Sequence, residues 1–352
     1  MDIPLHVTLR RKFRSFLYKI MSLFIKNNTT NTTLNPDEIQ SILIVRPNYR
    51  IGNLLFLTPL LEQLQTNMPH TKVDIIVGMK LAGDILQEIP NVKNVFSLPR
   101  DILYKPHKFL EILLKVRKTR YDLVLNISAG SLSSELVTLL TKATYKASFE
   151  SNKTLIPLTH KIKREHLFEH AGSKPLELLK IFPFKLPTKE QELQIFLTQE
   201  EKKKAKDDFE KLLQNNPKQK VISIFRNARF DKKIEDSWWL EWFEALKKID
   251  KDIVVVDVLS PDVPTKLHHD MLEYQNKNLR ILGAFFQQTS LYISADTGPL
   301  HLALASKAKT LALFNKTSKE RYGTLGEENL TLDINNLTPQ EVAQESYNLL
   351  VK

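Results

Sequence analysis

The chain has 352 residues, enough for two domains, and a hydrophobic fraction of 42%, which supports ordinary globular cores. It contains no cysteine, which excludes disulfides and thiolate chemistry. No apolar run approaches the roughly 20 residues that span a bilayer, and we see no His/Asp cluster at ligand spacing, so we expect no metal site. The formal net charge of +11 favours an anionic partner.

Much of this positive charge lies near the N-terminus, in residues 10–26. Apolar and aromatic residues recur there at helical spacing between basic flanks, a pattern typical of a helix lying on an anionic membrane surface. A helix packed onto the protein body remains an alternative. Lys19 interrupts the apolar stretch, which disfavours a signal peptide, and the aromatic residues form an apolar face, which disfavours a nucleic-acid arm. Residues 27–33 predict a polar linker, so residues 1–33 precede the first domain.

A strand–helix–strand unit is predicted next. Residues 41–46 form an apolar strand, residues 51–64 a helix opened by Gly52, and residues 72–78 a second strand. The loop after the first strand lies at the carboxyl edge of the sheet, where open α/β sheets bind ligands. Asn53 in this loop is also a good helix cap, which is the structural alternative to a functional role. The candidate ligand residues of the loop are Arg50, Gly52 and Asn53.

Strands and helices continue to alternate through the middle of the chain. We expect a helix at 108–120, a buried strand at 121–127, and a helix opened by residues 128–131. Three prolines between residues 165 and 187 indicate the connection between domains. The boundaries that follow are 34–180 for the first domain and 181–352 for the second.

The second domain opens with a charged helix through Leu213, which begins at a capping signal at Thr198. A strand at 221–225 follows, then a loop that contains Lys232 and Lys233. The tryptophan-rich helix start at 238–243 is expected to pack into the core. Further along, we predict a β-branched strand at 252–258 and a final helix capped at Thr338.

The most informative motif is Asp296-Thr297-Gly298-Pro299-Leu300-His301, between a short apolar run and a helix rich in small residues. Thr297 can cap the helix, Gly298 allows a ligand to approach the backbone, and Pro299 suits the first turn. Free N–H groups at a helix N-terminus bind phosphate readily. His301 is close enough in sequence to face the same ligand.

The loop around Gly52 and the motif at residues 296–301 together resemble motifs of glycosyltransferase family 9, the ADP-heptose:lipopolysaccharide heptosyltransferases. The family has an I-G-D-x-x-x-x-T-P block and a D-[ST]-G-x-x-H block, which match residues 51–59 and 296–301 here. The resemblance covers roughly residues 40–350 and implies the α/β GT-B architecture, two Rossmann-like domains facing across a cleft. It places the acceptor-side loop in the first domain and the nucleotide-sugar site in the second.

The resemblance also implies the chemistry. A sugar would pass from a nucleotide-sugar donor, with ADP-heptose the first expectation, to a lipopolysaccharide-core or other lipid-linked glycan, by an inverting reaction without a metal or cofactor. The donor would be bound by residues 296–299 and His301, with Lys232 or Lys233 opposite. The family's carboxylate base stands at the position of Asn53, and an amide cannot act as a base near neutral pH. Residues 314–317, Phe-Asn-Lys-Thr, also depart from the family's Gly-Pro-Thr loop.

Two alternatives remain open: a sugar-nucleotide isomerase of the same architecture, against which the acceptor-side loop 51–53 and the basic segment argue, and a non-catalytic nucleotide-sugar-binding protein, which Asn53 suggests. With the basic segment 10–26, the expected location is cytoplasmic, on the inner face of the cell membrane. No nucleic-acid partner is expected.

Overall fold

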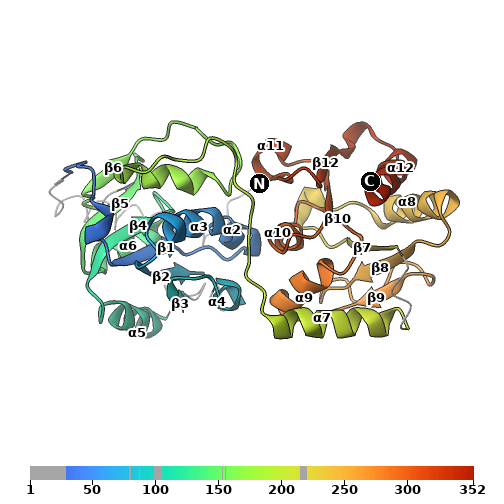
Figure 1. Ribbon diagram of the computed structural model, residues 1–352, viewed down its shortest axis with the longest axis horizontal. Coiled ribbons are helices and arrows are strands. Elements are labelled where there is room, and N and C mark those ends of the chain that lie inside the picture. Colours follow the sequence, from blue (N-terminus) through green and yellow to red (C-terminus); the bar gives the residue numbers. More distant parts are fainter. Residues whose placement is uncertain are drawn as a thin grey trace, which may run out of the picture. The chain divides into compact units, whose positions relative to one another are not determined.

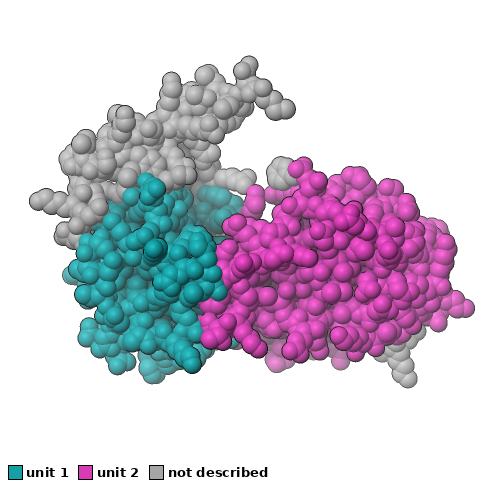
Figure 2. Space-filling model, turned by 90° about the horizontal axis from the view of Figure 1, so that it is seen from above, with its two compact units in different colours: residues 1–49, 60–167, 175–186 teal, residues 50–59, 168–174, 187–352 magenta. Residues whose placement is uncertain are grey.

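The computed structural model describes residues 29–78, 81–86, 88–98, 105–152, 154, 156–214 and 220–352, and the chain forms two compact units. Unit 1 contains the described residues up to Tyr49 together with 60–167 and 175–186, and unit 2 contains 50–59, 168–174 and 187–352 (Figure 2). The predicted membrane helix at 10–26 lies outside the described residues.

Unit 1 is built on a six-stranded parallel sheet in the order β3-β2-β1-β4-β5-β6. Its strands are β1 (Ser41–Arg46), β2 (Lys72–Val77), β3 (Val92–Ser97), β4 (Tyr121–Asn126), β5 (Ala143–Phe149) and β6 (His160–Ile162). Its helices are α3 (Thr58–Asn67), α4 (Leu81–Leu86), α5 (Pro106–Val116) and α6 (Leu132–Leu140), with 3-10 helices at Pro36–Glu38 and Lys174–Ile181. The connections change direction between β1 and β4, which makes the carboxyl ends of these two strands the topological switch point.

The start of the described chain is bound to the edge of this sheet. The N–H groups of Thr30 and Asn31 both donate to Thr159 O, at 2.9 and 3.1 Å, and Thr32 O lies 2.7 Å from a ring nitrogen of His160. Leu34 N–H donates to Ile181 O at 2.8 Å. The last residues of the predicted polar linker are therefore held by β6 and its preceding residue.

Unit 2 has a second six-stranded parallel sheet in the order β12-β11-β10-β7-β8-β9. Its strands are β7 (Val221–Phe225), β8 (Val254–Val258), β9 (Leu272–Tyr274), β10 (Leu291–Ala295), β11 (Thr310–Phe314) and β12 (Leu330–Asp333). Its helices are α2 (Ile51–Leu55), α7 (Gln199–Leu212), α8 (Asp236–Ile249), α9 (Leu279–Phe286), α10 (Gly298–Ala305), α11 (Lys319–Tyr322) and α12 (Pro339–Val351). Helices flank the sheet within each unit (Figure 1), and the switch point of unit 2 lies between β10 and β7.

The predicted α/β fold with parallel sheets is confirmed, and so is core packing of the tryptophan helix. Trp239 and Trp242 of α8 are fully buried, and Trp242 Nε1 donates to Ser346 Oγ of α12 at 3.2 Å. The capping boxes predicted at Thr198 and Thr338 are both formed. Within the described part of the chain, no helix has the length and apolar character needed to cross a membrane.

The prediction of one helix over residues 51–64 is wrong, because the segment forms two helices, α2 and α3. A continuous helix would need the N–H of Pro59 to bond the carbonyl of Leu55, and proline has no N–H. Thr58 Oγ1 donates to Leu55 O instead, at 2.8 Å. The short α2 is thereby separated from α3 and packs in unit 2 against α10.

Candidate active site

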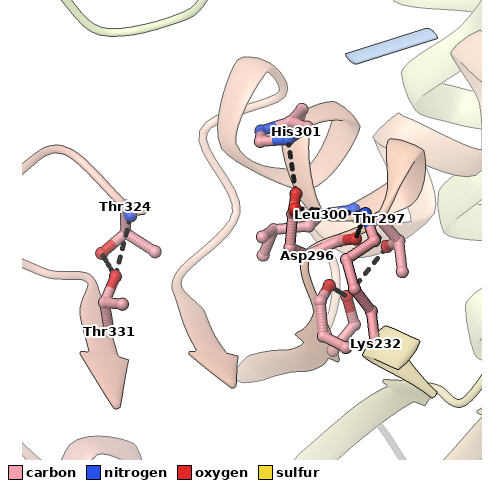
Figure 3. A network of polar contacts seen from close by, with 9 residues as sticks. Lys232, Asp296, Thr297, Leu300, His301, Thr324 and Thr331 are labelled. Atoms are coloured by element: carbon pink, nitrogen blue, oxygen red, sulfur yellow. Dashed lines mark hydrogen bonds and ion pairs between the residues drawn. The ribbon is translucent and has the colours of Figure 1, made fainter. Parts of the chain in front are cut away.

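The switch point of unit 2 brings a lysine and a carboxylate together. Lys232 ends a short 3-10 helix after β7, and Asp296 directly follows β10. Lys232 Nζ donates to the backbone oxygen of Asp296 at 2.6 Å and lies 3.1 Å from Asp296 Oδ2 (Figure 3). Lys233, the other candidate, has a half-exposed side chain 4.0 Å from Glu235. The structure therefore places Lys232 at the predicted motif and Lys233 away from it.

The second oxygen of Asp296 contacts the imidazole of His301. Asp296 Oδ1 lies 3.3 Å from His301 Nε2, and both side chains are nearly buried. Burial raises the pKa of Asp296, but the hydrogen bond and charge of His301, together with Lys232, outweigh it and lower that pKa to about 2. The carboxylate therefore stays ionised near neutral pH, orients both Lys232 and His301, and is a poor proton acceptor.

The N-terminus of α10 completes this part of the site. Thr297 is the N-cap, and its Oγ1 accepts the N–H of Leu300 at 3.2 Å. Gly298 and Pro299 occupy the first turn, as predicted. Pro299 has no N–H and the N–H of Leu300 is bonded to Thr297, so the N–H of Gly298 is the first-turn donor left without a partner within the helix, and the helix dipole adds partial positive charge there. Together with Lys232, this arrangement can bind a phosphate group.

The predicted loop around Gly52, which is far from α10 in the sequence, lies against this helix. A Cβ at Gly52 would be 2.5 Å from His301 Cδ2, so the imidazole occupies the space beside this glycine. Phe56 packs edge-on against His301, with ring centroids 4.7 Å apart, and also contacts His170 and Tyr322. Phe56 therefore forms one ring cluster with His170, His301 and Tyr322 of unit 2.

Asn53 does not cap this helix, so that alternative is wrong. The N-cap of α2 is Arg50, without a side-chain capping bond, and Asn53 is a half-buried residue inside the helix. α2 begins at Ile51, as predicted, and Leu54 N–H bonds Arg50 O at 3.2 Å, so Asn53 lies inside the helix. Asn53 thus directly follows the glycine that contacts His301.

A buried ion-pair network supports the loop that carries Lys232, and sequence reasoning missed it. Arg226, directly after β7, bonds Asp257 of β8 at 3.0 Å through Nε and Asp236 of α8 at 2.8 Å. A third bond reaches Thr265 O at 3.0 Å. Burial raises the pKa of Asp257 although Arg226 opposes the rise. The sequence signal available for this network was an arginine directly after a largely apolar strand.

A hollow of about 210 Å³ lies at the carboxyl ends of β11 and β12. It is lined by residues 314–320 with Asp333 and Asn335, so it includes the unusual Phe-Asn-Lys-Thr loop.

The expectation that the chain has no His/Asp cluster is wrong. His268, His269 and Asp270 offer ligand atoms within 4.8 Å of one another, because a tight loop before β9 turns consecutive side chains together.

Comparison with known proteins identifies relatives of this arrangement. The profile of "Glycosyltransferase family 9 (heptosyltransferase)" matches residues 110–261 and 274–350. A curated protein of Escherichia coli strain K12, named "Putative lipopolysaccharide heptosyltransferase 4", is 25% identical over 182 residues, which are 49% of this chain and 48% of that protein. The chain thus matches about half the length of this relative.

Solved structures match over most of the chain. A family 9 glycosyltransferase from Veillonella parvula DSM 2008 has a TM-score of 0.76 and 16% identity, covering 92% of this chain and 99% of that one. The E. coli heptosyltransferase WaaC with ADP has a TM-score of 0.69 and 18% identity, covering 88% and 99%; WaaC was also solved with ADP-2-deoxy-2-fluoro heptose. These likenesses show the fold, which is GT-B, with two Rossmann-like α/β units.

Proposed function

The chain belongs to glycosyltransferase family 9, and from that premise we propose that it transfers a sugar from a nucleotide-sugar donor to a hydroxyl group of a glycan acceptor. The observation that carries the proposal is the cluster of Lys232, Asp296 and His301 at the N-terminus of α10. A positively polarised helix end beside a lysine suits the diphosphate of such a donor.

In the proposed reaction, an acceptor hydroxyl oxygen bonds to C1 of the donor sugar. The bond from C1 to the diphosphate oxygen breaks, its electron pair leaves with the nucleoside diphosphate, and the hydroxyl proton passes to a base. Attack from the side opposite the leaving group inverts C1. Lys232 and the N–H of Gly298 at the start of α10 would stabilise the charge that develops on the diphosphate, in place of a metal ion.

ADP-heptose is the donor we propose, because the relatives are named heptosyltransferases and WaaC was solved with ADP and with an ADP-heptose analogue. The proposed acceptor is a lipopolysaccharide core or another lipid-linked glycan. We also propose that residues 10–26 hold the enzyme on the anionic cytoplasmic face of the membrane, where such an acceptor would be found.

The experiment is a thermal-shift and nucleotide-release screen with ADP-, UDP-, GDP- and CMP-sugars. Ligand binding raises apparent stability by mass action, so the true donor raises the melting temperature, and acceptor-dependent release of its nucleotide reports transfer. Gly298→Val should abolish donor binding without unfolding the protein, and His301→Ala should weaken it less. Binding without release would favour a non-catalytic protein, and nucleotide-sugar rearrangement without acceptor would favour an isomerase. Donor binding by Gly298→Val equal to that of the parent would contradict the phosphate site.

A further inference from the structure

The switch point of unit 1, between β1 and β4, carries a polar loop that the proposed mechanism does not use. The loop follows β4, spans residues 128–131 and leads into α6 (Figure 1). Gly130 has a φ of +73°, which turns the chain sharply at this edge of the sheet. The carboxyl edge at a switch point is where open α/β sheets bind ligands.

The N-terminus of α6 offers hydrogen-bond donors at this edge. Its N-cap is Ser131, whose side chain makes no capping bond. The N–H groups of Leu132 and Ser133 therefore have neither an intrahelical partner nor a capping oxygen. The hydroxyls of Ser131 and Ser133 lie 3.3 Å apart beside them, and both side chains are only partly buried.

A buried amide beneath the helix end supplies an independent sign of a ligand. Asn126, the last residue of β4, is fully buried; its Oδ1 accepts the N–H of Ser128 at 3.0 Å, whereas its Nδ2 has no hydrogen-bond partner among the described residues. Val124, two residues earlier on the same face of the strand, packs in one cluster with Val137 of α6. The amide of Asn126 therefore faces α6 at its N-terminal end, with an unused donor whose burial without a partner is costly.

The charge at this helix end indicates which class of ligand fits. Glu135 lies in the first turn of α6 and is fully buried, and its Oε1 accepts the N–H of Gly130 at 3.0 Å. The oxygens of this carboxyl group already act as hydrogen-bond acceptors at the positive end of the helix dipole. An added anion would bring only further acceptors to this place, whereas a neutral hydroxyl group can both donate and accept.

We propose that this loop binds a neutral sugar residue of the acceptor glycan through its hydroxyl groups. Asn126 Nδ2 and the N–H groups of Leu132 and Ser133 donate to sugar oxygens, and the hydroxyls of Ser131 and Ser133 exchange hydrogen bonds with sugar hydroxyls. The identity of the glycan rests on the proposed function, but its binding can be measured without turnover.

The probe is core oligosaccharide released from lipopolysaccharide by mild acid, used as prepared and after dephosphorylation, with inorganic phosphate as a separate arm. Amide resonances of Leu132 and Ser133 report the loop, and Leu300 reports the donor site. Both oligosaccharides should shift the Leu132 and Ser133 resonances, and inorganic phosphate should leave them in place. Shifts with phosphate alone, or with neither oligosaccharide, overturn the proposal.

Matched variants at one position separate the loop from the rest of the protein. Ser133→Phe should weaken oligosaccharide binding about tenfold or more by covering the N–H groups, whereas Ser133→Ala, which keeps the N–H groups and removes one hydroxyl, should weaken it less, by about threefold. Asn126→Asp, which replaces the free donor by an oxygen, gives a second test if Ser133→Phe does not fold, and it should also weaken binding. ADP affinity should be unchanged in all three. Equal oligosaccharide binding by a folded Ser133→Phe or Asn126→Asp protein refutes the site, while intact binding without nucleotide release refutes only the proposed transferase activity.

Discussion

Gly52 and His301 are far apart in sequence, yet the imidazole of His301 fills the space that a side chain at residue 52 would need, since a Cβ there would lie 2.5 Å from His301 Cδ2. The same imidazole contacts Asp296, which in turn holds Lys232. The loop around Gly52 and the motif Asp296–His301 are thus linked through one ring.

Gly52→Ala is therefore expected to displace His301 from Asp296. The new methyl group would overlap an imidazole that is packed against Phe56, so the ring must move. We expect weaker donor binding and nucleotide release reduced about tenfold or more, a loss of roughly 1.4 kcal/mol of transition-state stabilisation. Gly83→Ala in α4 is the matched control: its Cβ would meet Val95 atoms no closer than 3.8 Å, so activity should be unchanged. Parent-like activity of Gly52→Ala would show that the position of His301 is unimportant.

Asn53→Asp places a carboxylate at the position of the family's base. If the natural chain has lost its function through this one residue, the change should raise the transfer rate, since general-base catalysis typically contributes ~10²–10⁴-fold. We expect unchanged or lower activity instead, because the donor-side motif is intact and a new negative charge would stand near an anionic donor. Initial rates of both proteins with the same donor and acceptor decide the question. A large gain would support a mainly binding role for the natural chain.

Removal of residues 1–28 should abolish binding to anionic vesicles while leaving the fold intact. This end point keeps Thr30 and Asn31, whose N–H groups bond Thr159 O at the edge of the unit 1 sheet. Sedimentation with vesicles that contain phosphatidylserine should decrease with added salt for the full chain, because part of the attraction is electrostatic. A variant with Arg10, Arg11, Lys12 and Arg14 changed to alanine should bind less than the parent. Equal sedimentation of truncated and full-length proteins would exclude this segment as the membrane anchor.

His170 should make the protein less stable at mildly acidic pH. Burial, with the neighbouring charge of His301, lowers its pKa from 6.5 to about 4, although Glu190 opposes the shift. Below pH 6.5 the unfolded chain binds a proton that the folded chain does not, so stability falls as pH decreases from about 6.5 to about 4, by about 3 kcal/mol in total. Urea unfolding across this range measures the slope. His170→Phe should reduce this slope of the unfolding free energy against pH, whereas His269→Phe, at an exposed position, should leave it unchanged.

Loss of Arg226 should destabilise unit 2 and the loop that carries Lys232. Arg226→Leu would leave the carboxylate of Asp257, which is 1% exposed, buried without its partner, at a cost of about 3–5 kcal/mol. Replacing both residues, Arg226→Leu with Asp257→Leu, should cost less than the single change, because no unpaired charge remains. Denaturant midpoints give the comparison, and equal losses for the single and double variants would contradict the role of the buried charge.

The sequence by itself determined the elements and the chemistry available at their ends. Largely apolar runs such as Ser41–Arg46 and Val221–Phe225 form strands at those residues, because burial on both faces of a parallel sheet favours apolar side chains at consecutive positions. Capping residues such as Thr198 and Thr297 located helix starts, because their side-chain bonds are made within three residues of the cap. Pro59 also carries the signal for the break between α2 and α3, although the apolar pattern of residues 51–64 predicts one helix.

Only the tertiary structure decided which of these residues meet. Lys232 and Lys233 are equivalent in the sequence, but the turn after β7 directs Lys232 to Asp296 and Lys233 to Glu235. The assignment of residues 50–59 to unit 2, and the contact of Gly52 with His301, depend on side chains packed between segments that no local pattern relates. Periodicity and capping encode which face of an element is buried and where it ends, whereas the partner of that face is fixed by the packing of the whole unit.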